Sequence, residues 1–253
     1  MSAEPSNWPE GVARHVLGRV DSTMSEAARL APQLSGPAWI MAREQTAGRG
    51  RRGRGWHTQG GNFAATHVLR PGGGPAEAAL YSFVTALALD EALARVAGPA
   101  ARLSIKWPND VLLNGGKVAG ILLESLGTGG TLSHLAIGVG VNLDHAPGTE
   151  TLDPGALSPV SVLGETGIRV TQDEFLPVLA EAFARHQARF VTYGFAPIRT
   201  AWLARAARIG QTVRARTGTR THEGVFETID DSGAMILRTP EGRLAITAAE
   251  VFF

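Results

Sequence analysis

The segment Pro75–Val96 constrains the fold of this chain more than any other part of its sequence. Apolar residues recur in it at intervals of three and four, which is the spacing of one face of an α-helix. The residues of this face are Ala79, Leu80, Phe83, Val84, Leu87, Ala88 and Ala92. A helix with one apolar face has to bury that face against another layer. The pattern therefore predicts an amphipathic helix packed on a β-sheet.

Short apolar segments on both sides of this helix have the length and composition of strands. They comprise residues 15–20, 39–43, 62–69, 103–107, 111–113, 118–123 and 134–143. The turn Asn114-Gly115-Gly116 joins two of them as a hairpin. Capping-box spacing at Thr23–Glu26 and Thr171–Glu174 begins two further helices, which extend to about Leu34 and through Phe190. A last helix is predicted over residues 197–207.

From Ile209 onwards the sequence changes to short strand-like segments separated by turns. The segments are residues 212–216, 223–229, 234–237 and 244–247, with turns at residues 230–233 and 241–242. Such closely spaced short strands predict a small β-barrel. We therefore expect an α+β protein with a larger domain over residues 1–207 and a small C-terminal β-barrel domain over residues 208–253.

The composition is that of an ordinary globular protein. The chain has 253 residues, 44% of them apolar, and a formal net charge of +1, so no overall field attracts it to nucleic acid or to a membrane. It contains no cysteine, which excludes disulfides, thiolate catalysis and cysteine-ligated zinc. The first twenty residues do not form a signal peptide, and no apolar run is long enough to span a bilayer. We expect a soluble, cytoplasmic protein without a membrane partner.

Only two of the 24 basic residues are lysines, and both lie in compact motifs. Lys106 begins Lys106-Trp107-Pro108-Asn109-Asp110, and Lys117 begins Lys117-Val118-Ala119-Gly120-Ile121. Arginine offers a planar fork of donors, whereas lysine is a point charge that fits between phosphate and carboxylate oxygens. We therefore interpret both lysines as site residues. The alternative is that both are ordinary surface lysines.

Residues Gly48–Arg54, here called the Gly/Arg loop, combine four arginines with three glycines. Glycine lets backbone amides approach an anion, and arginine binds carboxylate or phosphate oxygens with two parallel hydrogen bonds. The loop therefore predicts a site for a polyanion. It is not a P-loop, because no Gly-Lys-Ser/Thr follows, and it is not a dinucleotide fingerprint, because no helix begins directly after the glycines. A disordered segment that binds RNA is the alternative.

Five motifs in this order resemble those of the biotin protein ligase family. They are Asp21-Ser22-Thr23, Gln45-Thr46-Ala47 followed by the Gly/Arg loop and Trp56, Lys106–Asp110, Lys117–Leu122, and Gly138-Val139-Gly140-Val141-Asn142. The resemblance covers residues 15–253 if the C-terminal segment is included. Two positions depart from the family pattern. Met24 stands where asparagine is common, and Ala249 precedes Glu250 where glycine is common.

The resemblance implies a mixed sheet with flanking helices, similar to class II synthetases, plus a small C-terminal β-barrel. It also implies an enzyme that joins biotin to ATP, in the presence of Mg²⁺, as biotinyl-5′-AMP. That enzyme then transfers biotin to a lysine of the biotin carrier domain of a carboxylase. About twenty residues precede Asp21, so we expect the ligase-only form, without a DNA-binding domain and without DNA as a partner. A homodimer is left open.

The resemblance also implies roles for individual residues. Those assigned to biotin are Ser22, Thr23, Gln45, Gly48, Arg49, Arg51, Lys117 and Gly120. Those assigned to ATP are Arg54, Trp56, Lys106, Asn109 and Asn142. The catalytic set is Lys117, Arg51, Lys106 and Asp110, with Asp110 either assisting the carrier lysine or only pairing with a cation. No residues are assigned to a resident metal, because the seven histidines show no ligand spacing.

Two other functions compete with this interpretation. Residues 185–220 contain eight arginines and no carboxylate, which together with the Gly/Arg loop is compatible with a nucleic-acid-binding module. A solvated helix face, or a surface for an acidic carrier domain, explains the same run. A lipoate ligase shares the acyl-adenylate chemistry, but it lacks the Gly/Arg loop and the Lys-Trp-Pro-Asn-Asp segment.

Overall fold

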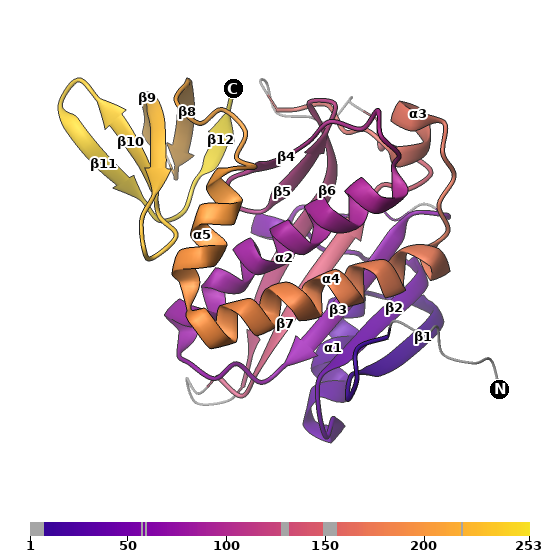
Figure 1. The fold of residues 1–253 in the computed structure, drawn as a ribbon. Helices are drawn as coiled ribbons and strands as arrows, with labels where there is room; N and C mark the ends of the chain where they lie inside the picture. Colours follow the sequence, from indigo (N-terminus) through magenta and orange to yellow (C-terminus); the bar gives the residue numbers. More distant parts are fainter. Residues whose placement is uncertain (1–7, 57, 59, 128–131, 149–155, 219) are drawn as a thin grey trace.

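The computed structural model describes residues 8–56, 58, 60–127, 132–148, 156–218 and 220–253. In this part of the chain a seven-stranded sheet carries helices on both faces, and a five-stranded sheet follows at the C-terminal end (Figure 1). The strands of the larger sheet, in spatial order, are β1 (Ala13–Val20), β2 (Ala38–Gln45), β3 (Phe63–Leu69), β7 (His134–Val141), β6 (Gly116–Leu126), β5 (Asp110–Leu113) and β4 (Leu103–Lys106).

The larger sheet is mixed, as the family resemblance implies. β1 pairs with β2 in parallel, and every other neighbouring pair in this sheet is antiparallel. The parallel pair requires a crossover, which is supplied by α1 (Thr23–Leu30) and the short 3₁₀ helix η1 (Ala31–Gln33). Because β1 and β2 run in the same direction, the segments that follow them leave the sheet at the same end. The site is built at that end.

Alternating side chains of the strands place helices on both faces of the sheet. In β2, Ile40 packs with Met24 and Ala27 of α1, whereas its neighbours Trp39 and Met41 belong to the main core on the other face. The main core contains α2 (Pro75–Val96), which has the bounds that its apolar spacing predicts. Helix α2 packs on the sheet and is covered in turn by α4 (Gln172–Tyr193) (Figure 1).

The helix ends agree with the sequence in part. Thr171 and Glu174 form the predicted capping box of α4, with each side chain bonded to the other's backbone N–H. At α1 the prediction is wrong: Ser22 is the N-cap, and its hydroxyl accepts a hydrogen bond from the Met24 N–H. The predicted last helix is α5 (Phe195–Leu203), which is shorter than expected, and the short α3 (Val162–Thr166) has no counterpart in the sequence prediction.

The C-terminal strands form an open sheet rather than the predicted closed barrel. Their spatial order is β11 (Gly242–Ile246), β10 (Met235–Thr239), β9 (Arg220–Ile229), β8 (Thr212–Thr217) and β12 (Glu250–Phe252). Residues 247–249 connect the two edge strands and reach about 15 Å at most, whereas a flat sheet of five strands is about 19 Å wide. The sheet is therefore curled, but its edge strands β11 and β12 do not pair within the described residues.

The connection between the two sheets continues the larger sheet. The Ile105 N–H donates to the Arg205 carbonyl at 2.8 Å, and the Ala207 N–H donates to the Ile105 carbonyl at 2.8 Å, so the linker pairs with edge strand β4. The buried ring of Trp202 lies between Phe83 of α2 and Phe226 of β9. These contacts fix the C-terminal sheet beside the end of the larger sheet.

Candidate active site

A cavity of about 480 Å³ opens where the ends of the larger sheet meet strand β12. The predicted site residues that line it are Ser22, Thr23, Gln45, Arg49, Arg51, Arg54, Trp56, Lys106, Asn109, Asp110, Lys117, Gly120 and Asn142. Gly48 is the one predicted residue that does not line the cavity. The structure therefore brings together residues from five separate motifs around a single space.

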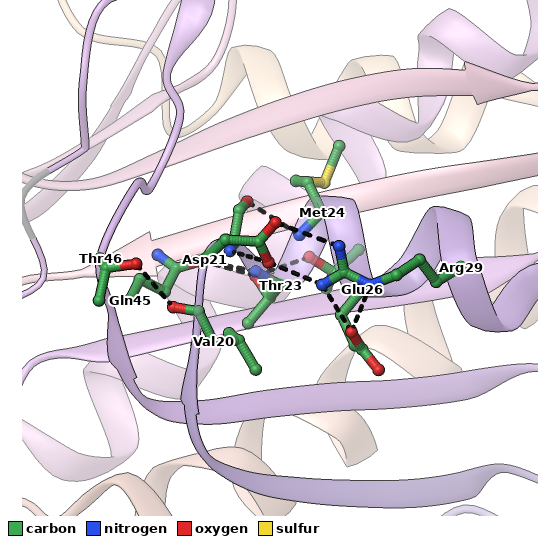
Figure 2. Close-up of polar contacts among 10 residues, drawn as sticks. Val20, Asp21, Thr23, Met24, Glu26, Arg29, Gln45 and Thr46 are labelled. Carbon is green, nitrogen blue, oxygen red and sulfur yellow. Dashed lines mark hydrogen bonds and ion pairs between the residues drawn. The ribbon is translucent and has the colours of Figure 1, made fainter.

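Neutral polar side chains, those of Ser22, Thr23 and Gln45, line the cavity where β1 and β2 end, and we call them the polar wall. Figure 2 shows the contacts between Thr23 and Gln45. The parallel register pairs Val20 with Gln45, so the residues after β1 lie beside the end of β2. The Gln45 side-chain oxygen accepts from the Thr23 N–H at 2.8 Å and from the Thr23 hydroxyl at 3.0 Å. The Gln45 amide nitrogen donates to the Thr58 hydroxyl at 3.0 Å. Hydroxyl and amide groups of this kind suit a neutral polar ligand that needs both donors and acceptors.

Asp21 and Arg29 support this wall from outside the cavity (Figure 2). The Asp21 carboxylate accepts from the Ser22 N–H at 2.7 Å and from both terminal nitrogens of Arg29, at 2.7 and 3.1 Å. Arg29 also binds Glu26 of its own helix. These bonds, with Arg29 first and Ser22 second, hold the pKa of Asp21 well below its usual value. Sequence reasoning missed Arg29, because nothing in the local pattern shows that it reaches back to Asp21.

The Gly/Arg loop folds back on itself next to this wall. The Trp56 N–H donates to the Gly48 carbonyl at 2.8 Å, and the Gly50 N–H donates to the Arg54 carbonyl at 2.7 Å. A Cβ on Gly48 would lie 2.4 Å from the Trp56 carbonyl oxygen, so the fold-back requires glycine at this position. Gly48 thus shapes the loop from behind.

The arginines of the loop reach different partners. Arg49 pairs with Glu124 of β6 at 3.1 Å, and Arg51 donates to the Asn109 side-chain oxygen at 3.0 Å. Burial lowers the pKa of Arg51 from its usual value. Arg52 and Arg54 both pair with Glu250 of β12, at 3.3 and 2.5 Å. The loop therefore connects the larger sheet to the C-terminal sheet across the cavity.

The two lysines belong to strands β4 and β6, and both line the cavity. The Lys117 ammonium pairs with the Asp110 carboxylate at 2.8 Å and lies 5.8 Å from the Trp56 ring centre. The Lys106 ammonium lies 5.4 Å from the Phe253 ring centre. Burial lowers the pKa of Lys106, and the nearby charge of Lys117 acts in the same direction while Asp110 opposes it. Both predicted lysines are thus in the cavity.

Glycines of β6 and β7 form a floor that sequence reasoning only partly identified. A Cβ on Gly140 would lie 2.2 Å from the Trp56 indole, and a Cβ on Gly120 would lie 3.2 Å from it. A Cβ on Gly138 would lie 2.8 Å from the sulfur of Met24. The signal was present in the sequence, because glycines at every second position of a strand leave one face without side chains.

Asn142 lines the cavity but its side chain has a structural partner. Its amide nitrogen donates to the Val160 carbonyl at 3.0 Å, and it is 2% exposed. The Val162 N–H donates to the Asn142 carbonyl, so this residue fastens the segment before α3 to the end of β7. Asn109 has a similar double use, since its amide nitrogen donates to the Ile121 carbonyl at 2.7 Å while its oxygen accepts from Arg51.

Much of the arginine-rich stretch 185–220 is neutralised within the molecule. Its ion pairs are Arg185 with Glu91 and Glu181, Arg199 with Asp231, Arg205 with Asp90, and Arg216 with Glu250. The carboxylates come from other segments, which is why the stretch looks purely basic in sequence. This distribution favours a structural use of these arginines over a nucleic-acid surface.

The described part of the chain contains neither a cluster of metal-ligating side chains nor a helix that could span a membrane. No three His, Cys, Asp or Glu side chains lie close enough together there to hold a metal ion. None of the helices in those residues combines the length and the apolar composition needed to cross a bilayer.

Known families and relatives match this chain over most of its length. The model of the biotin/lipoate A/B protein ligase family matches residues 16–142, and the model of the biotin protein ligase C-terminal domain matches residues 209–253. A biotin–acetyl-CoA-carboxylase ligase of Paracoccus denitrificans is 65% identical over 238 residues, which are 94% of this chain and 99% of the relative. The bifunctional ligase/repressor BirA of Bacillus subtilis is 33% identical over 84% of this chain, which spans 65% of BirA.

Solved structures share the fold. The biotin protein ligase of Aquifex aeolicus in complex with biotin and ATP has a TM-score of 0.78 at 24% identity, over 94% of this chain and 97% of that one. The biotin protein ligase of Leishmania major in complex with biotinyl-5-AMP has a TM-score of 0.65 at 22% identity, over 95% of this chain and 100% of that one. With both family models matched and a 65% identical relative covered almost end to end, this chain belongs to the biotin protein ligase family.

Proposed function

We propose that this chain activates biotin with ATP to form biotinyl-5′-AMP and pyrophosphate, and then transfers biotin to a lysine of a carboxylase carrier domain. The observation that carries the proposal is the convergence of two kinds of group on one cavity. Ser22, Thr23 and Gln45 offer neutral polar contacts on one wall, while the loop arginines and the two lysines supply positive charge next to it.

The first reaction requires two anions to approach each other. Biotin's carboxylate attacks the α-phosphorus of ATP, a P–O bond forms, and pyrophosphate leaves with the electrons of the broken bond. Fixed cations lower the barrier because they neutralise the charge on the phosphoryl oxygens, and no protein nucleophile is needed. The described lining residues include six cationic side chains against two carboxylates, which suits this step.

The positions of the residues support a direction for the substrates. Biotin's ureido ring would bind at Ser22, Thr23 and Gln45, with its carboxylate toward Lys117 and Arg51. The lining residues Arg49 and Gly120 would then flank the bound biotin. Gly48 would act only through the shape of the loop.

The nucleotide would occupy the rest of the cavity. Arg54 and Lys106 would hold the phosphates, and Trp56 with the segment fastened by Asn142 would border the base. Asn109 would act by orienting Arg51, to which it is already bonded.

In the second reaction the carrier lysine's amine attacks the acyl carbon and AMP leaves. The amine must first lose a proton, and Asp110 is the carboxylate nearest the proposed reaction centre, at 2.8 Å from Lys117. We propose that Asp110 accepts this proton. Its alternative role is to hold Lys117 in place, and the two roles separate in the Asp110→Asn variant described in the Discussion.

The proposal also covers the metal ion, the C-terminal domain, the protein partner and the location. The described residues offer no cage for Mg²⁺, so we propose that the ion enters with ATP, held by phosphate oxygens, as is common for this ion. We propose residues 208–253 as a separate C-terminal domain, which is supported by the family match over residues 209–253. The proposed partner is the carrier domain of a carboxylase, since the Paracoccus relative is named for acetyl-CoA carboxylase, and the proposed location is the cytoplasm.

Biotin-dependent exchange of labelled pyrophosphate into ATP tests the proposed function. We expect exchange with biotin and none with lipoate. Exchange with lipoate alone would favour the other branch of the matched family. Absence of exchange with either vitamin, together with RNA binding that weakens steeply with salt, would favour the nucleic-acid-binding module.

A further inference from the structure

Glu250 occupies an unusual position for a carboxylate in a site that has to bind anions. It is the first residue of β12, it lines the cavity, and its side chain is 15% exposed. Three arginines pair with it: Arg54 at 2.5 Å, Arg216 at 2.7 Å and Arg52 at 3.3 Å. Arg216 belongs to the neighbouring strand β8, directly opposite Glu250 in the register, whereas the other two come from the Gly/Arg loop. The carboxylate therefore joins the loop to the C-terminal sheet.

Repulsion within the loop explains why a counter-charge is needed there. Arg51, Arg52 and Arg54 are almost consecutive, and the neighbouring charges of Arg52 and Arg54 both act to lower the pKa of Arg51. Unpaired, these guanidinium groups would drive the loop apart. Glu250 supplies a negative charge that pairs with two of them, Arg52 and Arg54.

The backbone of the loop supports the same interpretation. Arg52 has φ 57° and ψ 32°, in the left-handed region that residues other than glycine seldom occupy, and Gly53 follows with φ 73°. A non-glycine residue persists in this region where its surroundings hold it. The ion pair between Arg52 and Glu250 is such a constraint, because it directs the side chain toward β12.

Carboxylate and phosphate oxygens are interchangeable partners for arginine, since both accept two parallel hydrogen bonds. Building on the proposed function, we propose that Glu250 is a positioning residue. It holds the Gly/Arg loop across the cavity before nucleotide binds, and the phosphates of the nucleotide then replace its carboxylate at Arg52 and Arg54. Arg216 keeps Glu250 in place after the exchange. The C-terminal sheet thereby takes part in nucleotide loading through one side chain.

Limited digestion with trypsin tests the ligand-free contact, because trypsin cuts after the loop arginines when they open. The full chain is digested without ligands, and cuts after Arg51 and Arg54 are assigned by mass spectrometry. We expect Glu250→Gln to accelerate these cuts about fivefold to tenfold, as loss of several coupled ion pairs would. Arg52→Asn should give a smaller acceleration, since asparagine tolerates the left-handed backbone but lacks the charge.

A matched control comes from the same sheet. Glu227 of β9 pairs with Arg243 away from the described cavity lining, so Glu227→Gln should leave the loop cuts at the wild-type rate. Glu250→Asp should restore part of the protection, because it keeps the charge. Equal loop cutting in wild type and Glu250→Gln would overturn the proposal. Acceleration by Glu227→Gln to the level of Glu250→Gln would also overturn it, because the effect would then be a general loosening of the sheet.

Digestion in the presence of nucleotide tests whether phosphates replace the Glu250 carboxylate at Arg52 and Arg54. Saturating ATP should bring Glu250→Gln and wild type to the same low cutting rate, whereas adenosine, which has no phosphates, should not. A difference that persists with ATP would refute the exchange. A failure of the proposed function can be distinguished from a failure of this inference. If the wild type shows no biotin-dependent pyrophosphate exchange, the ligase activity is refuted. The digestion rates measured without nucleotide would still decide whether Glu250 holds the loop.

Discussion

Lys117 differs from the arginines around it because its charge is compact. Its ammonium group lies 2.8 Å from Asp110, at the edge of the glycine floor. A lysine held in this way can contact the biotin carboxylate and the α-phosphate together, which a planar guanidinium does less well. We therefore expect the first half-reaction to depend on this side chain more than on any one arginine.

We expect Lys117→Ala to reduce biotin-dependent pyrophosphate exchange by about 100-fold or more, because a cation at the reacting oxygens is lost. Asp110→Asn is the matched control, since it breaks the same ion pair but keeps the cation. That variant should retain most of the exchange and lose biotin transfer to the carrier lysine. If both variants lose exchange equally, the ion pair has only a structural role, and Asp110 would not be assigned to the carrier lysine.

The lowered pKa of Lys106 predicts that kcat/KM for ATP depends on pH. Burial lowers its pKa below the ordinary 10.5, with Lys117 and Arg54 acting in the same direction and with Asp110 and Glu250 opposing them. As pH rises, free enzyme therefore loses this charge earlier than an ordinary lysine would, and binding of the phosphates weakens. We expect kcat/KM for ATP to fall on an alkaline limb whose midpoint lies below 10.5, and Lys106→Arg to remove that limb. An unchanged limb in the arginine variant would assign it to another group.

At this scale the sequence predicted the charged residues well and their supports poorly. The lysines, the loop arginines, Ser22 and Thr23 stand in contiguous motifs, and all line the cavity. Glu250 and Arg29 could not be identified, because their roles come from contacts between distant segments. Gly48 was assigned to biotin but does not line the cavity, and the sequence could not show this, because a close backbone approach and a ligand contact give the same glycine signal.

Among the elements, α1 serves the site and the fold with the same residue. Ser22 caps the helix through the Met24 N–H, and it also lines the cavity beside Thr23. Thr171 caps α4 through the Glu174 N–H, and it does not appear in the described cavity lining. The two helices thus provide a comparison between a cap in the site and a cap outside it.

We expect Ser22→Ala and Thr171→Ala each to lower the free energy of unfolding by about 1 kcal/mol, as loss of an N-cap usually does. Only Ser22→Ala should also weaken biotin binding. Urea unfolding measures the first quantity and calorimetric titration with biotin measures the second. Equal biotin affinity in the two variants would show that the Ser22 hydroxyl serves the helix alone.

The elements themselves were largely predictable. The periodicity gave α2 with its observed bounds and placed a strand at each member of the larger sheet, because long-range packing there agrees with local preference. It missed β12 and α3, which have three and five residues and depend on pairing with distant segments. The predicted small β-barrel is an open sheet in the structure, because strand spacing specifies short antiparallel strands but not whether the two edge strands pair.

For the whole molecule, the linker between the two sheets, residues 204–211, is anchored to helix α2 by an ion pair. Asp90 of α2 is 5% exposed, and its carboxylate binds Arg205 at 2.7 Å. Burial raises the pKa of Asp90, while Arg205 opposes that rise by favouring the charged form. Because Arg205 also accepts the Ile105 N–H through its carbonyl, the pair lies where the linker joins β4.

We expect Arg205→Ala to lower the free energy of unfolding by about 1 to 2 kcal/mol at neutral pH, since a buried carboxylate loses its cation while part of the pair is solvent-screened. Without Arg205 the folded-state pKa of Asp90 rises further above its unfolded value. A protonated Asp90 needs no cation, so the deficit should be small at acid pH. It should grow as pH rises above the folded-state pKa of Asp90 in the wild type and level off above the higher pKa in the variant. Urea unfolding at a series of pH values measures it, and a deficit independent of pH would contradict this explanation.

The polar wall contains residues that follow β1 and a residue at the end of β2. The parallel pairing of β1 with β2 fixes the position of these residues relative to one another. Successive residues of a strand face opposite sides, so inserting one residue in β1 would turn its side chains to the wrong face relative to Gln45. Inserting two would restore the alternation. We expect a single insertion after Gly18 to give a folded protein that no longer retains the vitamin, and a double insertion to recover part of the binding in the same calorimetric titration. A change in the length of this edge strand therefore has to keep the alternation, unless a bulge absorbs the extra residue.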